Sequence, residues 1–165
     1  MGEEPRWLDA EEQETWLAMV GMFIRVPAAL DAQLQRDASI SHFEYQVLAG
    51  LSMAPAYTLR MSELAEFAEG SLSRLSHTTS RLAKKGWIRR KPDPDDGRCT
   101  LATLTDEGLE KVVATAPGHV AEARRVFVDV LTKAQRKQLR EIARRINGAI
   151  GPGGSIVPAE ERRTL

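Results

Sequence analysis

The feature of this sequence that most constrains its fold is the stretch between Ser41 and Thr105, where cap and turn residues divide the chain into short elements. Ser41 and Glu44 have the spacing of a capping box, in which each side chain accepts a hydrogen bond from the backbone N–H of the other residue. The apolar residues that follow share one helical face, and Pro55 is incompatible with a continuing helix. The sequence therefore predicts a short helix that begins at Ser41 and ends near Pro55.

Two more helices follow, and each of them ends at a glycine. Apolar spacing predicts a short helix over residues 61–68, and Gly70 is typical of a helix end. Ser71 is a suitable N-cap for the next helix, which the pattern predicts over residues 72–85 with Gly86 as its terminator. The order so far is two short helices and then a longer one.

A β-hairpin is predicted directly after these helices. Residues 87–91 read as a short strand, and residues 99–104 alternate as a returning strand. Between them, residues 92–98 have the sequence PDPDDGR, which is dense in turn formers. The hairpin therefore has a charged tip that contains proline.

Long helices are predicted on both sides of this stretch. Apolar residues recur at helical spacing over residues 8–36, where Pro27 predicts a kink or a local break. Residues 106–147 are expected to form a helix over about 106–131, with a kink near Pro117, and a final helix that Thr132 and Gln135 open as a second capping box. Residues 148–165 read as a flexible tail. The predicted fold class is mainly α with a small β-hairpin, in a single domain over residues 1–165.

Charge is distributed unevenly along the chain, although the formal net charge is zero with 23 basic and 23 acidic residues. Residues 71–91 contain seven basic residues and no acidic one, whereas residues 1–20 contain six acidic residues and one basic residue. Phosphate binding depends on the charges near the nucleic-acid backbone and not on the molecular total. The basic stretch therefore predicts a nucleic-acid contact despite the zero net charge.

The predicted helix over residues 72–85 has two contrasting faces. Leu75, Thr78 or Thr79, and Leu82 form the face expected to be buried. Helix residues near the N-terminus reach base edges in a major groove, so the opposite face suggests a reader of DNA. We expect base contacts from Ser73, Arg74 and His77, and backbone contacts from Ser80, Arg81 and Lys84. Further DNA-binding residues are expected in the strand that follows, at Arg89, Arg90 and Lys91. The alternative interpretation is an ordinary solvated helix face.

The hairpin tip carries a second candidate DNA contact. Arg98 is suited to a minor groove, where the negative potential attracts guanidinium groups. Asp96 could pair with a basic neighbour and hold the tip in shape. A surface turn that is charged for no particular purpose is the alternative.

These elements resemble the multiple-antibiotic-resistance regulator (MarR) family of bacterial winged helix-turn-helix proteins. The resemblance is carried by ISHFEYQVLAGLS and by MSELAEFAEGSLSRLSHTTSRLAKKGWIRRKPDPDDGRCTLATLTDEG. The most specific part is the hairpin tip, in which Asp96 and Arg98 match the family's wing signature. The N-terminal WLDAEEQETW resembles actinobacterial members more loosely.

The resemblance implies a DNA-binding lobe over residues 41–105, with the helix over 72–85 as its recognition helix and Arg98 in the minor groove. It also implies that residues 8–36 and 106–147 form dimerisation helices, so that a homodimer reads a near-palindromic operator, most commonly as a repressor. Family members often bind a small phenolic or lipophilic effector between these helices and the DNA-binding lobe. The candidate lining residues are Trp16, Met19, Phe23, His42, Tyr45 and Met53, for which ordinary core packing is the alternative.

Other function classes receive little support from the sequence. Three scattered histidines, and the absence of any glycine-rich phosphate loop or nucleophile motif, argue against an enzyme, a metal or another cofactor. The family's peroxide sensors resemble each other in having a reactive cysteine near the first helix, and this chain has no cysteine there. Cys99 lies instead in the predicted returning strand, where the basic residues around it could lower its pKa.

The sequence also bears on the cellular location of the protein and on the alternatives to the predicted function. The acidic N-terminus lacks an apolar signal-peptide core, and no uninterrupted apolar run approaches the roughly 20 residues needed to span a bilayer, so we expect a cytoplasmic protein. The alternative functions are a winged-helix module that binds proteins and a non-specific DNA-binding protein without a ligand response. The basic run over residues 71–91 argues against the first of these.

Overall fold

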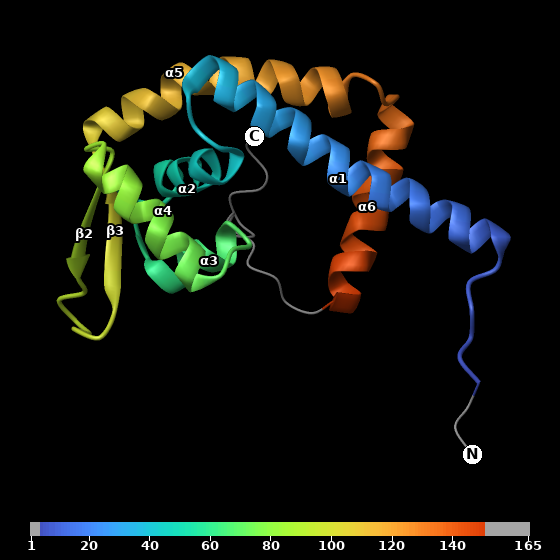
Figure 1. Ribbon diagram of the computed structural model, residues 1–165, viewed down its shortest axis with the longest axis horizontal. Helices are drawn as coiled ribbons and strands as arrows, with labels where there is room; N and C mark the ends of the chain where they lie inside the picture. Colours follow the sequence, from blue (N-terminus) through green and yellow to red (C-terminus); the bar gives the residue numbers. More distant parts are fainter. Residues whose placement is uncertain (1–3, 151–165) are drawn as a thin grey trace.

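The computed structural model describes residues 4–150 and is mainly helical, with one small three-stranded antiparallel sheet (Figure 1). This confirms the predicted fold class. The elements in chain order are α1 (Ala10–Ala38), α2 (His42–Ser52), a 3-10 turn (Pro55–Tyr57), β1 (Thr58–Arg60), α3 (Met61–Phe67), α4 (Leu72–Lys84), β2 (Ile88–Pro92), β3 (Thr100–Leu104), α5 (Asp106–Ala123), a π-helical turn (Arg124–Val128) and α6 (Lys133–Ile150). In Figure 1, α2, α3, α4 and the sheet form a lobe on the left, whereas the start of α1 and all of α6 lie to the right.

The lobe over residues 41–105 is built around one apolar core. Its members come from α2, α3, α4 and the sheet, and they include Val47, Leu48, Leu51, Leu64, Leu75, Leu82, Ala102 and Leu104. The predicted capping box begins α2, because Ser41 Oγ accepts from the Glu44 amide at 3.1 Å and Glu44 Oε2 accepts from the Ser41 amide at 2.8 Å. Local sequence signals therefore set the start of α2, and apolar packing fixes its place in the lobe.

The sheet contains a strand that the sequence did not predict. Its order is β1-β3-β2, and Leu59 of β1 pairs with Ala102 of β3. The hairpin of β2 and β3 was predicted correctly, with Ile88 opposite Leu104. Three residues are too few to show an alternating pattern, so β1 is defined only by its hydrogen bonds to β3.

The two long helices α1 and α5 lie alongside each other (Figure 1). Lys111 Nζ of α5 donates to the Ala38 carbonyl at the end of α1 at 2.8 Å. α1 continues through Pro27, so the local break that was one of the predicted outcomes does not occur. α5 likewise continues through Pro117 and gives way to the π-helical turn at Arg124, before the end near residue 131 that the sequence suggested.

The last helix begins as a second capping box. Thr132 Oγ1 accepts from the Gln135 amide at 3.2 Å, and Gln135 Oε1 accepts from the Thr132 amide at 2.8 Å. α6 then extends to Ile150, so the prediction that the flexible tail begins at residue 148 is wrong for residues 148–150. These three residues continue the preceding helix, and residues 151–165 lie outside the described part of the chain.

One helix is long and apolar enough, by length and composition alone, to cross a membrane, and it is α1. α1 has no uninterrupted apolar run of about 20 residues, because Arg25 and Asp31 interrupt it. Much of its apolar surface is exposed, with Trp16, Leu17, Phe23 and Ile24 each more than half accessible. Such a surface also fits a soluble helix that buries one face against a second chain.

Candidate nucleic-acid interface

α4 is oriented by its buried face. Leu75 and Leu82 are fully buried, and Thr79 is buried with its hydroxyl bonded to the Leu75 carbonyl at 3.0 Å. Thr78 is buried as well, so both threonines that the sequence offered belong to this face. Ser71 caps the helix, because its Oγ accepts from the Arg74 amide at 3.2 Å.

The opposite face of α4 carries the residues expected to contact DNA. Ser73, Arg74, His77, Arg81 and Lys84 are exposed, and Ser80 is half-buried. They lie on the surface that faces away from the core, as the spacing predicted. Their contacts with DNA remain predictions, because exposure alone does not show what these side chains bind.

Three of the arginines near this face are held by neighbouring side chains. The guanidinium carbon of Arg74 lies 4.0 Å from the centroid of the Phe43 ring, a cation–π contact. Arg81 Nη2 lies 3.4 Å from Glu44 Oε1, and Arg90 Nη1 donates to Ser80 Oγ at 2.8 Å. These contacts tie α4 to the start of α2 on one side and to β2 on the other.

The hairpin of residues 88–104, which we call the wing, presents its charges to solvent. Arg89, Arg90 and Lys91 are all exposed along β2. At the tip, Asp96 Oδ1 accepts from the Arg98 backbone amide and from Arg98 Nε, both at 3.2 Å. The Arg98 backbone bond, followed by its side-chain bond and one from Cys99, lowers the pKa of Asp96. The Arg98 side chain is 93% exposed, so most of its guanidinium can meet a ligand.

The tip end of the wing is held to β1 by an ion pair that sequence reasoning missed. Asp93 Oδ2 lies 2.8 Å from Arg60 Nη2, and the Asp93 carboxylate raises the pKa of Arg60. Asp93 Oδ1 also accepts from the Asp95 amide at 3.0 Å, so the buried carboxylate shapes the turn as well. An Asp at the start of a turn was a local signal, but its partner on β1 lies far away in the sequence.

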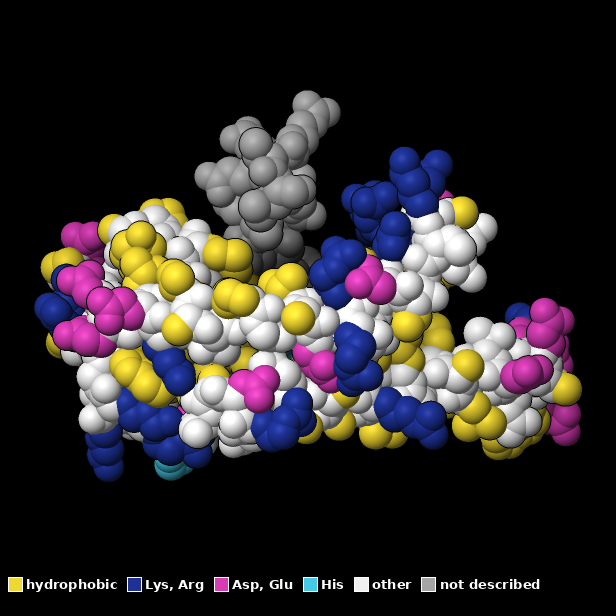
Figure 2. Space-filling model, turned by 90° about the horizontal axis from the view of Figure 1, so that it is seen from above, with side chains coloured by type: hydrophobic (Ala, Val, Ile, Leu, Met, Phe, Trp, Pro, Cys, Tyr) yellow, Lys and Arg dark blue, Asp and Glu magenta, His cyan; other side chains and the backbone are white. Residues whose placement is uncertain are grey.

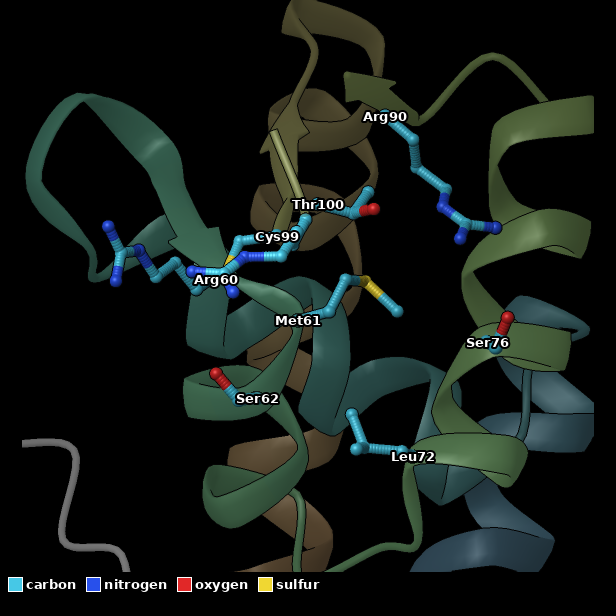
Figure 3. Close-up of a pocket in the computed structure, with 9 residues that line it drawn as sticks. Arg60, Met61, Ser62, Leu72, Ser76, Arg90, Cys99 and Thr100 are labelled. Atoms are coloured by element: carbon cyan, nitrogen blue, oxygen red, sulfur yellow. The ribbon is translucent and has the colours of Figure 1, made fainter. Parts of the chain in front are cut away.

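A hollow of about 320 Å³ lies between the wing, α3 and the start of α4 (Figure 3). In Figure 3, Arg90 extends from β2 toward α4, and Leu72 and Ser76 contribute from α4 itself. The full lining is Arg60, Met61, Ser62, Leu72, Ser76, Arg90, Arg98, Cys99 and Thr100, which includes three arginines and no acidic residue. Its chemistry suits an anionic backbone that passes between α4 and the wing.

The distribution of charge over the whole surface agrees with this reading. In Figure 2, Lys and Arg side chains gather along the lower left edge, at the end of the molecule that carries α4 and the wing. Acidic side chains cover the right-hand end, where α1 begins with Glu11 and Glu12 in its first turn. Figure 2 also shows acidic side chains above this basic edge at the left and further basic side chains at the upper right, so charge is spread unevenly but is not divided into two regions.

Comparisons with known proteins identify the architecture. The MarR family model matches residues 40–100. Sco3205 of Streptomyces coelicolor, a MarR family transcriptional regulator solved in complex with DNA, is 46% identical with a TM-score of 0.86, over 92% of this chain and 94% of Sco3205. YxaD of Bacillus subtilis, an uncharacterised HTH-type transcriptional regulator, is 30% identical over 77% of this chain and 87% of YxaD. The chain belongs to the MarR family.

Another MarR family structure is similar to most of this chain. AbsC of Streptomyces coelicolor, also a MarR family transcriptional regulator, is 32% identical with a TM-score of 0.83, over 88% of this chain and 98% of AbsC. The chain spans only about half the length of some curated relatives, including 54% of YdcH of Bacillus subtilis. The likeness to Sco3205 and AbsC covers the long helices as well as the lobe.

The effector pocket suggested by the MarR resemblance is only partly assembled within one chain. His42 and Tyr45 of α2 meet His119 of α5, with ring centroids 5.8 Å and 4.5 Å from His119. Burial lowers the pKa of both histidines, although Asp31 opposes the effect at His42, and His42 itself lowers the pKa of His119 further. His119 was not predicted as a lining residue, because its partners come from a different helix.

The remaining predicted lining residues lie elsewhere. Trp16 is fifteen residues before Asp31 on α1, about 22 Å along a helix that rises 1.5 Å per residue, and the Asp31 carboxylate contacts the His42 amide. Met19 and Phe23 lie between them on α1, and Met53 follows the opposite end of α2 from His42. The six predicted residues are therefore spread along α1 and along α2 with its C-cap Met53.

Cys99 behaves differently from the sequence-based suggestion about its reactivity. The thiol donates to Asp96 Oδ2 at 3.5 Å, and this bond, together with burial and the charge of Asp96, raises the pKa of Cys99. The suggestion that basic neighbours lower its pKa is therefore wrong, because a carboxylate is the nearer charge. Within residues 4–150, no group of three or more His, Cys, Asp or Glu side chains is arranged to hold a metal ion.

Proposed function

We propose that this chain is a sequence-specific DNA-binding transcriptional regulator that represses its targets as a homodimer on a near-palindromic operator. The observation that carries the proposal is the joint placement of the exposed polar face of α4 and the exposed Arg98 at the wing tip. α4 and the wing lie at the left end of Figure 1, the end at which Figure 2 shows Lys and Arg side chains along the lower edge, and the relative Sco3205 was solved in complex with DNA. A protein-binding winged helix would not require this arrangement of cations.

We infer a groove for each element from the general preferences of helices and of arginine side chains. α4 enters a major groove, where Ser73, Arg74 and His77 near its N-terminal end reach base edges. Arg98 enters the adjacent minor groove, where the potential is most negative in narrow A·T-rich segments. The backbone between the two grooves then passes over the hollow of Figure 3, where Arg90 and the hydroxyl of Ser76 face it.

The homodimer is supported by apolar side chains that a single chain leaves exposed. On α1 they are Trp16, Leu17, Phe23 and Ile24, and on α5 and α6 they are Val113, Val120, Ile142, Ile146 and Ile150. Large apolar side chains exposed on three long helices indicate a protein contact, and α1 and α6 both extend away from the lobe in Figure 1. Pairing through these helices would set two α4 helices about 34 Å apart, one turn of DNA.

An effector would act between the helices and the lobe, where His42, Tyr45 and His119 meet. His119 Nδ1 is buried and has no hydrogen-bond partner among the described residues, so it offers one unused polar atom to a small phenolic or lipophilic molecule. The second chain of the homodimer would complete the enclosure. A repressor of this kind acts on chromosomal DNA, which places the protein in the cytoplasm, with α1 buried in the dimer and not in a membrane.

Replacing Arg98 with Ala tests the proposal directly. Loss of a specific DNA contact costs about 1–3 kcal/mol, so we expect about tenfold weaker binding to the operator by fluorescence anisotropy. The melting temperature should not change, because the side chain is almost fully exposed. Arg144→Ala on α6 removes the same charge far from the wing and should leave affinity within about twofold. Equal losses of operator affinity in both variants would mean that Arg98 contributes only through its net charge, which would contradict the proposal.

A further inference from the structure

Glu44 lies between α2 and α4, and its two carboxylate oxygens have different partners. Oε2 accepts from the Ser41 amide at 2.8 Å and completes the capping box that begins α2. Oε1 faces α4 and lies 3.4 Å from Arg81 Nη2 and 3.8 Å from Lys85 Nζ. The side chain is only 9% exposed, so this carboxylate is largely removed from water.

The capping role does not explain why this residue is charged. Glutamine serves equally well at the third position of a capping box, because the cap needs an acceptor and not a charge. A buried carboxylate is costly unless cations compensate it. Residues 71–91 contain no acidic residue, so Glu44 supplies a negative charge from α2 to a helix that has none. Its charge is therefore directed at α4.

The consequence concerns how the cations of α4 meet phosphate. Arg81 and Lys85 are 62% and 40% exposed, so both could reach a DNA backbone, yet both are drawn toward the start of α2. Arg74 is held on the same side by the neighbouring Phe43 ring. Non-specific DNA binding comes almost entirely from cations that neutralise phosphates, independently of sequence. Because Arg81 and Lys85 are held away from the DNA backbone, non-specific binding is weakened more than binding that also uses base contacts.

We propose that Glu44 is a specificity-determining residue, whose carboxylate holds Arg81 and Lys85 against α2 and so suppresses binding to DNA of arbitrary sequence. The inference rests on the proposed DNA binding and deepens it. On the operator, Ser73, His77 and Arg98 add contacts that do not depend on Glu44, so the restraint costs less there. Glu44 thus lowers non-specific affinity more than operator affinity.

Glu44→Gln tests this directly, because Gln keeps the cap and the side-chain volume but removes the charge. We expect the variant to bind a random-sequence duplex roughly threefold to tenfold more tightly, the range that two partly exposed ion pairs cover. The log–log dependence of affinity on KCl should become steeper by about 0.9 to 1.8, one or two additional phosphate contacts. The ratio of operator to random-duplex affinity should fall.

Glu12→Gln is the matched control. Glu12 occupies the same capping-box position in α1, where its Oε2 accepts from the Asp9 amide at 3.1 Å, and α1 begins at the opposite end of the molecule from α4 (Figure 1). This variant makes the same change in net charge and should leave the salt slope unaltered. An equal change in both variants would assign the effect to net charge and overturn the inference.

A second pair of variants does not depend on the stability of Glu44→Gln. Arg81→Gln and Lys85→Gln are made singly in the otherwise unaltered chain. Removing a cation that contacts a phosphate freely lowers the slope of log affinity against log KCl by about 0.9, and each of these variants should lower that slope on a random duplex by less. A full reduction in either variant, or an unchanged slope in Glu44→Gln, refutes the role of Glu44. A chain that binds every duplex equally well instead refutes the proposed function, so the two failures are distinguishable.

Discussion

Thr105 joins the wing to α5, and replacing it with Ala should lower the free energy of unfolding by about 2 to 3 kcal/mol. Thr105 Oγ1 accepts from the Gly108 amide at 3.0 Å and donates to the Gly86 carbonyl at 2.7 Å. The lost helix cap is worth about 1 kcal/mol and the second hydrogen bond about 1 kcal/mol. The methyl group of this 8% exposed side chain adds up to about 0.8 kcal/mol.

The assay is urea unfolding followed by far-UV circular dichroism at one fixed protein concentration, since a dimer's stability depends on concentration. For a chain of this size, the loss corresponds to a melting temperature about 4 to 12 °C lower. Thr105→Ser keeps both hydrogen bonds and loses only the methyl group, so it should cost less than about 1 kcal/mol. If the Ala and Ser variants unfold within about 0.5 kcal/mol of each other, the hydroxyl does not hold this junction and the reasoning is refuted.

Two further predictions concern the histidine cluster and the dimer. Burial lowers the native pKa of His42 and His119 below the unfolded value, so the unfolded state binds more protons as pH falls through about 6.5. Stability to urea should therefore decline from pH 7.5 toward 5, and His119→Gln should flatten that decline. Equal pH profiles for the two proteins would contradict this prediction. Ile24→Glu places a charge on the exposed apolar face of α1 and should weaken the dimer by about tenfold or more in sedimentation velocity, while an unchanged dimer would exclude this face.

The elements that sequence predicted well are those whose signals are local. The capping boxes at Ser41 and Thr132 mark the starts of α2 and α6, and Ser71 marks α4. The buried face of α4 followed from apolar spacing alone, which also placed the exposed polar residues. The groove assignments came from the general preference of helices for the major groove and of guanidinium groups for the minor groove, and the family resemblance agrees with them.

The features that sequence reasoning missed depend on residues brought together by the fold. β1 exists through its bonds to β3, and the Arg60–Asp93 pair joins strand β1 to the wing. His119 meets His42 and Tyr45 only because α5 packs beside α2. The raised pKa of Cys99 likewise follows from the folded wing tip, whereas the basic residues nearby in the sequence suggested the opposite direction.

The central claim is that this chain reads a particular DNA sequence as a two-fold dimer. Selection of bound duplexes from a random library tests it most directly, because it presupposes neither operator nor effector. The account predicts a near-palindrome with half-sites about 10 base pairs apart, centre to centre, one turn of the double helix. Recovery of sequences without a common motif, combined with binding that disappears steeply with salt, would contradict it.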